Sequence, residues 1–203
     1  GRFVRDTARN RHWVTADGSA GPTGDAGFKA ESGRYHLYVS HACPWAHRTI
    51  IFRALKQLQD HITVSVVNPL MLDDGWTFET DEYGATGDEL LGKSLMHQVY
   101  TESDPKASGR VTVPVLWDRE TNRIVSNESS EIIRMFNSAF DGITGNQLDF
   151  WPEAMRDAIE EINEDIYHNI NNGVYKAGFA TTTEAYEEAV INLFAGLDRM
   201  DAR

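Results

Sequence analysis

The stretch Ser40-His41-Ala42-Cys43-Pro44-Trp45-Ala46-His47-Arg48 contains the only cysteine of the 203-residue chain. It follows a short β-type run at residues 35–39 and precedes a helical pattern. A thiol at a strand-to-helix turn lies at the positive end of the helix dipole, which lowers the pKa of the thiol below its free value of about 8.5. Pro44 suits the first helical position because its missing N–H would have no partner there. The sequence therefore predicts a reactive Cys43 that works with an external thiol.

The residues around this stretch form a strand–helix–strand pattern. Residues 35–39 alternate weakly as a strand, and residues 45–58 place their apolar side chains on one helical face. Residues 62–67 form a β-branched run, which is typical of a strand. Two strands joined by a helix at this spacing form a βαβ unit, so we expect the two strands to be parallel.

The α/β pattern continues after a long interruption. Residues 68–109 are too long for an ordinary connection, and we expect a short helix within them at 89–99. Beyond this insertion the sequence predicts a β-hairpin and a helix, with strands at 113–117 and 123–125 and the helix at 131–140.

The last quarter of the chain is predicted to be purely helical. One apolar stripe indicates a helix that begins at Pro152 and is capped by Gly173. A second helix is expected to start near Thr181 to Thr183, where Thr181 and Glu184 could form a capping box.

These patterns divide the chain into four parts. They are an N-terminal arm and loop at 1–34, an α/β domain at 35–140, a linker at 141–150 and the start of a helical domain at 151–203. Because the chain stops at Arg203 within a strong helical pattern, we expect it to be a fragment of a longer protein.

Composition and charge exclude several classes of function. The formal net charge is −12, and the only basic segment is a short arm that we interpret as solvated, so we expect no nucleic-acid partner. No apolar run approaches the roughly 18 residues of a membrane span, and no export signal is present, so we expect no membrane partner. A lone cysteine suits a reducing cytoplasm, where we place the protein. The arm contains Arg2, Arg5, Arg9 and Arg11.

Several motifs together resemble one family. They are Cys43-Pro44-Trp45-Ala46, Val113-Pro114, residues 126–132, the insertion with Trp76, and residues 171–180. Jointly they resemble the Xi-class glutathione transferases, the glutathionyl-hydroquinone reductases. The resemblance implies an α/β thioredoxin-like N-terminal domain, in the order βαβ…ββα, followed by an all-helical glutathione-transferase C-terminal domain that is truncated here. It also implies a homodimer.

The chemistry of glutathione fits the same residues. An extended peptide needs backbone hydrogen bonds, which Val113 can provide if its bond to Pro114 is cis, as we expect. The helix start near Ser129 offers N–H groups and a hydroxyl to the α-carboxylate, and Glu128 is placed for the ammonium. The resemblance assigns glutathione contacts to Trp76, Arg110, Val113, Glu128 and Ser129, and a hydroquinone contact to Tyr175.

Each of these residues also has a purely structural interpretation. Glu128 and Ser129 could only start a helix, Arg110 could be a solvated charge, and Trp76 could anchor its loop. Tyr175, expected after the helix cap, could be a core tyrosine. His47 lies four residues after Cys43 and could move protons, although a structural role is the more common one. The seven histidines show no metal signature, so we expect no metal.

The predicted reaction is the removal of glutathione from a glutathionyl-hydroquinone. The Cys43 thiolate attacks the thioether sulfur, the hydroquinone leaves, and glutathione as co-substrate resolves the Cys43–glutathione mixed disulfide. Two alternatives stay open: an omega-type thiol transferase or dehydroascorbate reductase, and a non-catalytic glutathione-binding regulator.

Overall fold

The computed structural model describes residues 1–203, and their contacts divide the chain into two units. Residues 8–150 form one unit, called here the thioredoxin-like unit. Residues 1–7 and 151–203 form the other, called here the helical unit. The first seven residues are thus part of the same unit as the last 53 residues in the sequence, while residues 8–34 belong with the sheet that follows them.

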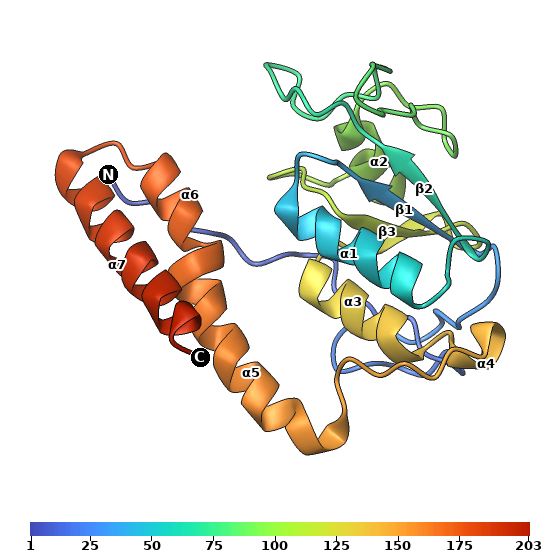
Figure 1. Cartoon of the computed structure of the whole chain (residues 1–203). Coiled ribbons are helices and arrows are strands. Elements are labelled where there is room, and N and C mark those ends of the chain that lie inside the picture. Colours follow the sequence, from blue (N-terminus) through green and yellow to red (C-terminus); the bar gives the residue numbers. More distant parts are fainter. The chain divides into compact units, whose positions relative to one another are not determined.

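A mixed four-stranded sheet in the order β2-β1-β3-β4 forms the centre of the thioredoxin-like unit (Figure 1). β1 is parallel to β2 and antiparallel to β3, which in turn is antiparallel to β4. The predicted βαβ unit and hairpin are therefore confirmed. The strands are β1 (Tyr35–Val39), β2 (Ile62–Val66), β3 (Val115–Asp118) and β4 (Arg123–Ser126).

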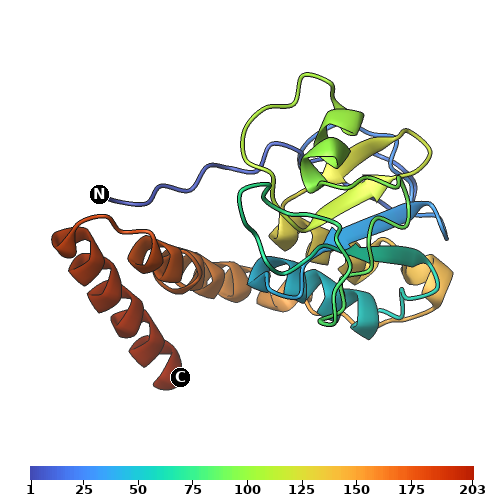
Figure 2. The ribbon, with the colours of Figure 1, turned by 90° about the horizontal axis from the view of Figure 1, so that it is seen from above.

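Helices cover both faces of this sheet. α1 (Pro44–Leu55) and α3 (Ser129–Ser138) lie side by side on one face, and α2 (Met96–Ser103) lies on the other (Figures 1 and 2). All five residues of β1 are buried for this reason. Tyr35 and Tyr38 lie three residues apart on β1, so their side chains point to opposite faces of the sheet. Tyr35 contacts Phe140, which follows α3, and Tyr38 contacts Phe78 of the insertion. A four-residue helix, α4 (Asp141–Thr144), follows α3.

The helix predicted at 89–99 is wrong in its position. Residues 89–91 form a turn instead, because the Asp88 carboxylate accepts hydrogen bonds from the backbone N–H groups of Leu90, Leu91 and Lys93. Gly92 then takes a left-handed φ of 65°, which ends any helical run. The helix begins only at Met96, where the Gln98 side chain accepts from the Leu95 N–H at 3.1 Å.

The helical unit consists of one interrupted helical rod and one long helix beside it (Figure 1). The rod contains a 3-10 turn η1 (Glu153–Met155), α5 (Arg156–Asp165), a π-helical segment η2 (Ile166–Asn171) and α6 (Gly173–Gly178). The long helix is α7 (Thr183–Asp201). None of the helices is both long enough and apolar enough to cross a membrane.

Two predicted helix ends differ in this unit. Gly173 begins α6 instead of capping a helix; a Cβ there would lie 3.2 Å from Leu193 Cδ1, so the glycine allows close packing of α6 on α7. The N-cap of α7 is Thr182 and not Thr181, because the Thr182 hydroxyl accepts from the Ala185 N–H at 3.3 Å.

The arginines of the N-terminal arm each contact protein groups, although much of the arm stays exposed to solvent, as predicted; the paired Arg2 side chain is 74% exposed. In the helical unit, Arg2 pairs with Glu188 at 2.5 Å, and Arg5 Nε donates to Asn172 Oδ1 at 2.6 Å. In the thioredoxin-like unit, Arg9 donates to the Ser108 carbonyl and Arg11 pairs with the buried Glu131. These contacts fix the arm to the protein.

Candidate active site

Cys43 is the N-cap residue of α1, as the sequence predicts. Its backbone is extended, with φ −100° and ψ 112°, and Pro44 opens the helix. The Cys43 N–H donates to the Ser40 carbonyl at 3.2 Å, and the Cys43 carbonyl accepts from the His47 N–H at 3.0 Å. The residue is 9% exposed, so its sulfur is largely covered while it lies at the positive end of a 12-residue helix. The lowered pKa of this thiol stays a prediction.

Val113 brings a backbone edge to this sulfur. The Val113–Pro114 peptide bond is cis, which confirms the expectation. Cys43 Sγ donates to the Val113 carbonyl at 3.5 Å. The Val113 N–H, in contrast, donates to no other group of the protein. A free backbone donor beside the cysteine is what an extended peptide ligand requires for pairing.

The start of α3 forms the second part of the candidate site. Glu128 is the N-cap, and its carboxylate accepts from the Ser130 N–H at 3.0 Å and from the Ser130 hydroxyl at 2.8 Å. Ser129 is the first residue of α3 and is 3% exposed. The predicted positions of both residues at a helix start are thus present in the structure.

Arg48, to which the sequence analysis gives no role, joins α1 to this helix start. Its Nε and Nη2 atoms donate to Ser129 Oγ at 3.1 and 2.8 Å. The same Nη2 lies 3.9 Å from Glu128 Oε1, and the guanidinium stands 5.3 Å from the centre of the Trp45 ring. No local signal reveals this contact, because Arg48 and Ser129 are 81 residues apart in the sequence.

Trp76 and Arg110 come from two long loops of the same unit. The Trp76 ring is partly buried against the core, and its carbonyl accepts from the Met96 N–H at 2.9 Å, which ties the insertion to α2. Arg110 is exposed in the segment between α2 and β3. The structure thus brings Cys43 and Val113 into contact and links Ser129 to α1, while Trp76 and Arg110 lie on loops of this unit.

Tyr175 belongs to the helical unit, and its predicted place after a helix cap is wrong. It lies inside α6, because the helical rod continues past Gly173. The Tyr175 ring stacks on Phe3 and on Phe179, each with a centroid distance of 6.1 Å. The Arg5 guanidinium lies 4.5 Å from the centre of the same ring. Tyr175 is therefore the centre of an aromatic cluster.

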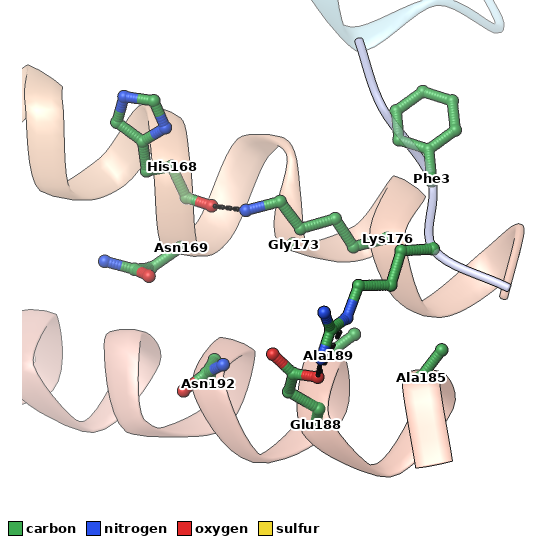
Figure 3. A pocket seen from close by; sticks show the side chains of 10 residues that line it. Phe3, His168, Asn169, Gly173, Lys176, Ala185, Glu188, Ala189 and Asn192 are labelled. Carbon is green, nitrogen blue, oxygen red and sulfur yellow. Dashed lines mark hydrogen bonds and ion pairs between the residues drawn. The ribbon is translucent and has the colours of Figure 1, made fainter. Parts of the chain in front are cut away.

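A separate cavity of about 220 Å³ lies between η2, α6 and α7 of the helical unit (Figure 3). Arg2 and Lys176, which both line the cavity, already bind protein oxygens: Arg2 pairs with Glu188, and Lys176 Nζ donates to the His168 carbonyl at 2.9 Å. None of the predicted site residues lines this cavity.

The structure shows no cluster of three or more histidine, cysteine, aspartate or glutamate side chains arranged to hold a metal ion. The His47 side chain is exposed on the second turn of α1.

Comparison with known proteins identifies the family of the chain. The model of the glutathione S-transferase N-terminal domain matches residues 42–139, which include Cys43, Val113 and the start of α3. The four-stranded sheet and its helices also match solved glutathione transferases, so the chain belongs to the glutathione transferases.

Within that family the chain belongs to the Xi class. It is 58% identical to glutathionyl-hydroquinone reductase YqjG of Escherichia coli (strain K12), over 99% of this chain and 61% of the relative. It is 49% identical to glutathionyl-hydroquinone reductase PcpF of Sphingobium chlorophenolicum, with the same two coverages. The chain thus spans about three fifths of the length of these relatives.

Two solved structures agree with this placement. The glutathione-bound structure of YqjG superposes with a TM-score of 0.93, over 96% of this chain and 63% of that chain at 58% identity. The glutathione transferase Xi of Phanerochaete chrysosporium superposes with a TM-score of 0.90, over 97% and 65% at 48% identity. The resemblance and the fold inferred from the sequence are confirmed.

Proposed function

We propose that the protein is a glutathionyl-hydroquinone reductase. The observation that carries the proposal is the placement of Cys43 at the start of α1, in contact with the backbone of a cis Val113–Pro114 pair. The similarity to two proteins named glutathionyl-hydroquinone reductases supports the same activity. A cysteine at this position favours reduction over simple conjugation, because conjugation needs only an ionised glutathione and no sulfur from the enzyme.

The reaction proceeds in two exchange steps. The Cys43 thiolate attacks the thioether sulfur of the substrate, so that an S–S bond forms and the carbon–sulfur bond breaks. The aromatic carbon keeps the electron pair and takes a proton from water or a neighbouring acid, which releases the hydroquinone. A second glutathione thiolate then attacks the Cys43–glutathione disulfide, releases glutathione disulfide and restores the Cys43 thiolate. Glutathione is therefore a co-substrate, and no metal takes part.

The residues around Cys43 hold the glutathione part of the substrate. The Val113 N–H and carbonyl pair with its cysteinyl residue in an extended conformation. Ser129 at the start of α3 binds the α-carboxylate and Glu128 binds the ammonium. Trp76 and Arg110 provide further contacts from their loops, as the family resemblance implies.

The hydroquinone contact is assigned to Tyr175 in the helical unit. The rings of Phe3 and Phe179 stack on the Tyr175 ring and the Arg5 guanidinium lies 4.5 Å from its centre, and these contacts hold the side chain in place. A phenol in a fixed direction can bind a phenolic oxygen with little loss of conformational entropy. We further propose that the protein acts as a homodimer in the cytoplasm, where a reducing environment keeps Cys43 as a thiol.

The activity is tested with glutathionyl-menadiol and excess glutathione on the full-length protein. We expect release of menadiol, and loss of this release in Cys43→Ala. Activity on dehydroascorbate or mixed disulfides alone would instead indicate the omega-type thiol transferase, a possibility raised by a relative named glutathione S-transferase omega-like 2 of Schizosaccharomyces pombe, 51% identical over 86% of this chain. Binding of glutathione without any turnover would indicate the regulator.

A further inference from the structure

The hydroxyl of Ser129 is buried and accepts hydrogen bonds from the Arg48 guanidinium. Ser129 is 3% exposed, and Arg48 donates to its Oγ from both Nε and Nη2. A serine hydroxyl has two acceptor positions and one proton to donate. Because the hydroxyl accepts from the cationic Arg48 guanidinium on one side, its proton points away from that group and is available to a further acceptor. No oxygen or nitrogen of the protein accepts this proton.

A buried donor without an acceptor is costly and rare in native proteins. The surroundings of this proton favour an anion, since the Arg48 guanidinium and the N-terminus of the ten-residue α3 are both positive. The carboxylate of Glu128 does not fill this role, because it is turned toward the N–H and hydroxyl of Ser130. The missing acceptor therefore has the chemistry of a ligand carboxylate.

We infer that Arg48 is a positioning residue, which orients the Ser129 hydroxyl toward the α-carboxylate of glutathione. This inference rests on the proposed function, and it adds to it the residue that makes the carboxylate subsite selective. The guanidinium is itself held in place from two sides. Its Cζ atom lies 5.3 Å from the centre of the Trp45 ring, and its Nε and Nη2 atoms donate to Ser129 Oγ. Trp45 thus connects the Cys43 turn to the carboxylate subsite through Arg48.

A lysine cannot replace Arg48 in this role. An ammonium is a single charge on a flexible stem, and it cannot donate two hydrogen bonds in one plane to the same oxygen while it stacks on an indole ring. The geometry therefore requires a guanidinium, and not only a positive charge, at position 48.

The experiment measures the binding of S-methylglutathione to the full-length protein by calorimetry. This probe keeps the α-carboxylate but cannot form a disulfide with Cys43. We expect Arg48→Met and Ser129→Ala each to weaken binding by about 10-fold or more, the range for a lost hydrogen bond to a charged group. Arg48→Lys should also lose most of the affinity. The double variant should bind within about 2-fold of the weaker single variant, because both changes remove the same contact.

Two controls make the result specific. Arg53→Met removes a guanidinium from the same helix that donates to Ile62 and Gln59 carbonyls, and it should leave the affinity within about 2-fold. A probe that lacks the α-carboxylate, S-methyl-γ-aminobutyryl-cysteinylglycine, should bind wild type and Arg48→Met equally. Circular dichroism shows whether each variant is folded.

Three outcomes would overturn the inference. If the loss of affinity in the double variant is the product of the two single losses, Arg48 contacts glutathione directly. If Arg48→Met weakens the binding of both probes equally, Arg48 acts elsewhere than at the α-carboxylate. Unchanged binding by Arg48→Met would remove its role altogether. If the wild-type protein binds no S-methylglutathione, the proposed function itself fails. If the wild type turns over its substrate normally and Arg48→Met binds the probe as well as wild type does, only the positioning role is overturned.

Discussion

His36 makes the stability of the thioredoxin-like unit depend on pH. It lies in the middle of β1 and is 1% exposed. Its two ring nitrogens are 2.6 Å from Thr63 Oγ1 and 2.9 Å from Ser65 Oγ, and its ring contacts Tyr38 edge-on. Burial, together with the positive charge of Arg119, lowers the pKa of His36 from 6.5 to about 4. The imidazole is therefore neutral in the folded protein at neutral pH.

The direction of the effect follows from the two pKa values. Between pH 6.5 and about 4 the unfolded chain binds a proton at His36 and the folded protein does not, so acid stabilises the unfolded state. The contribution of His36 is fully present above pH 6.5 and is lost as the pH falls toward 4. At about 1.36 kcal/mol for each unit of pKa, the full loss amounts to about 3 kcal/mol, of which about 2.5 kcal/mol falls between pH 7.5 and 4.5.

The assay is urea unfolding followed by tryptophan fluorescence at pH 7.5 and 4.5. Wild type is compared with His36→Gln, which keeps a polar side chain but cannot take up a proton in this range. The unfolding free energy of wild type should fall by about 2.5 kcal/mol more than that of the variant over this interval. His47→Gln, a change at an exposed position, should follow wild type. Equal losses in wild type and His36→Gln would refute the reasoning.

Three further predictions concern single positions. Arg34→Met should destabilise the protein by about 3–5 kcal/mol in thermal unfolding, because it leaves the buried Asp118 carboxylate without its ion pair. A variant that combines Arg34→Met with Asp118→Asn should recover part of this lost stability. If it recovers none, the pairing is contradicted. Gly173→Ala should cost about 1–3 kcal/mol, since the new Cβ meets Leu193, and Gly178→Ala, with open space around it, serves as the control. Cys43 should react with iodoacetamide at pH 6 faster than free cysteine does, and an equal or slower rate in the folded protein would disprove its activation.

The sequence predicts well those features that depend on neighbouring residues. The strand before Cys43, the proline after it and the apolar face of the following helix all lie within one short segment, and each has a local physical reason. The cis bond between Val113 and Pro114 is expected from the fold that the sequence resembles, and X–Pro is the pair for which a cis bond costs little. The fold of the thioredoxin-like unit follows from such local features, whereas the family follows from several motifs along the chain taken together.

The features that the sequence does not predict depend on contacts between distant residues. The helix near residue 89 is displaced by the side chain of Asp88, which competes for the backbone N–H groups. Gly173 resembles a helix cap in the sequence, whereas in the structure its lack of a Cβ allows α7 to pack closely against it. Arg48 acts on a residue 81 positions away, so only the folded structure reveals its link to Ser129.

The assignment of residues 1–7 to the helical unit has a consequence for synthesis of the protein. The ribosome makes these residues before the thioredoxin-like unit and makes α7, to which Arg2 binds, after it. Residues 8–150 can fold while translation continues, as domains commonly do. The first seven residues must wait for their partners until translation has passed Glu188. Residues 1–7 thus reach their place only after the whole thioredoxin-like unit, which follows them in the sequence, has been made.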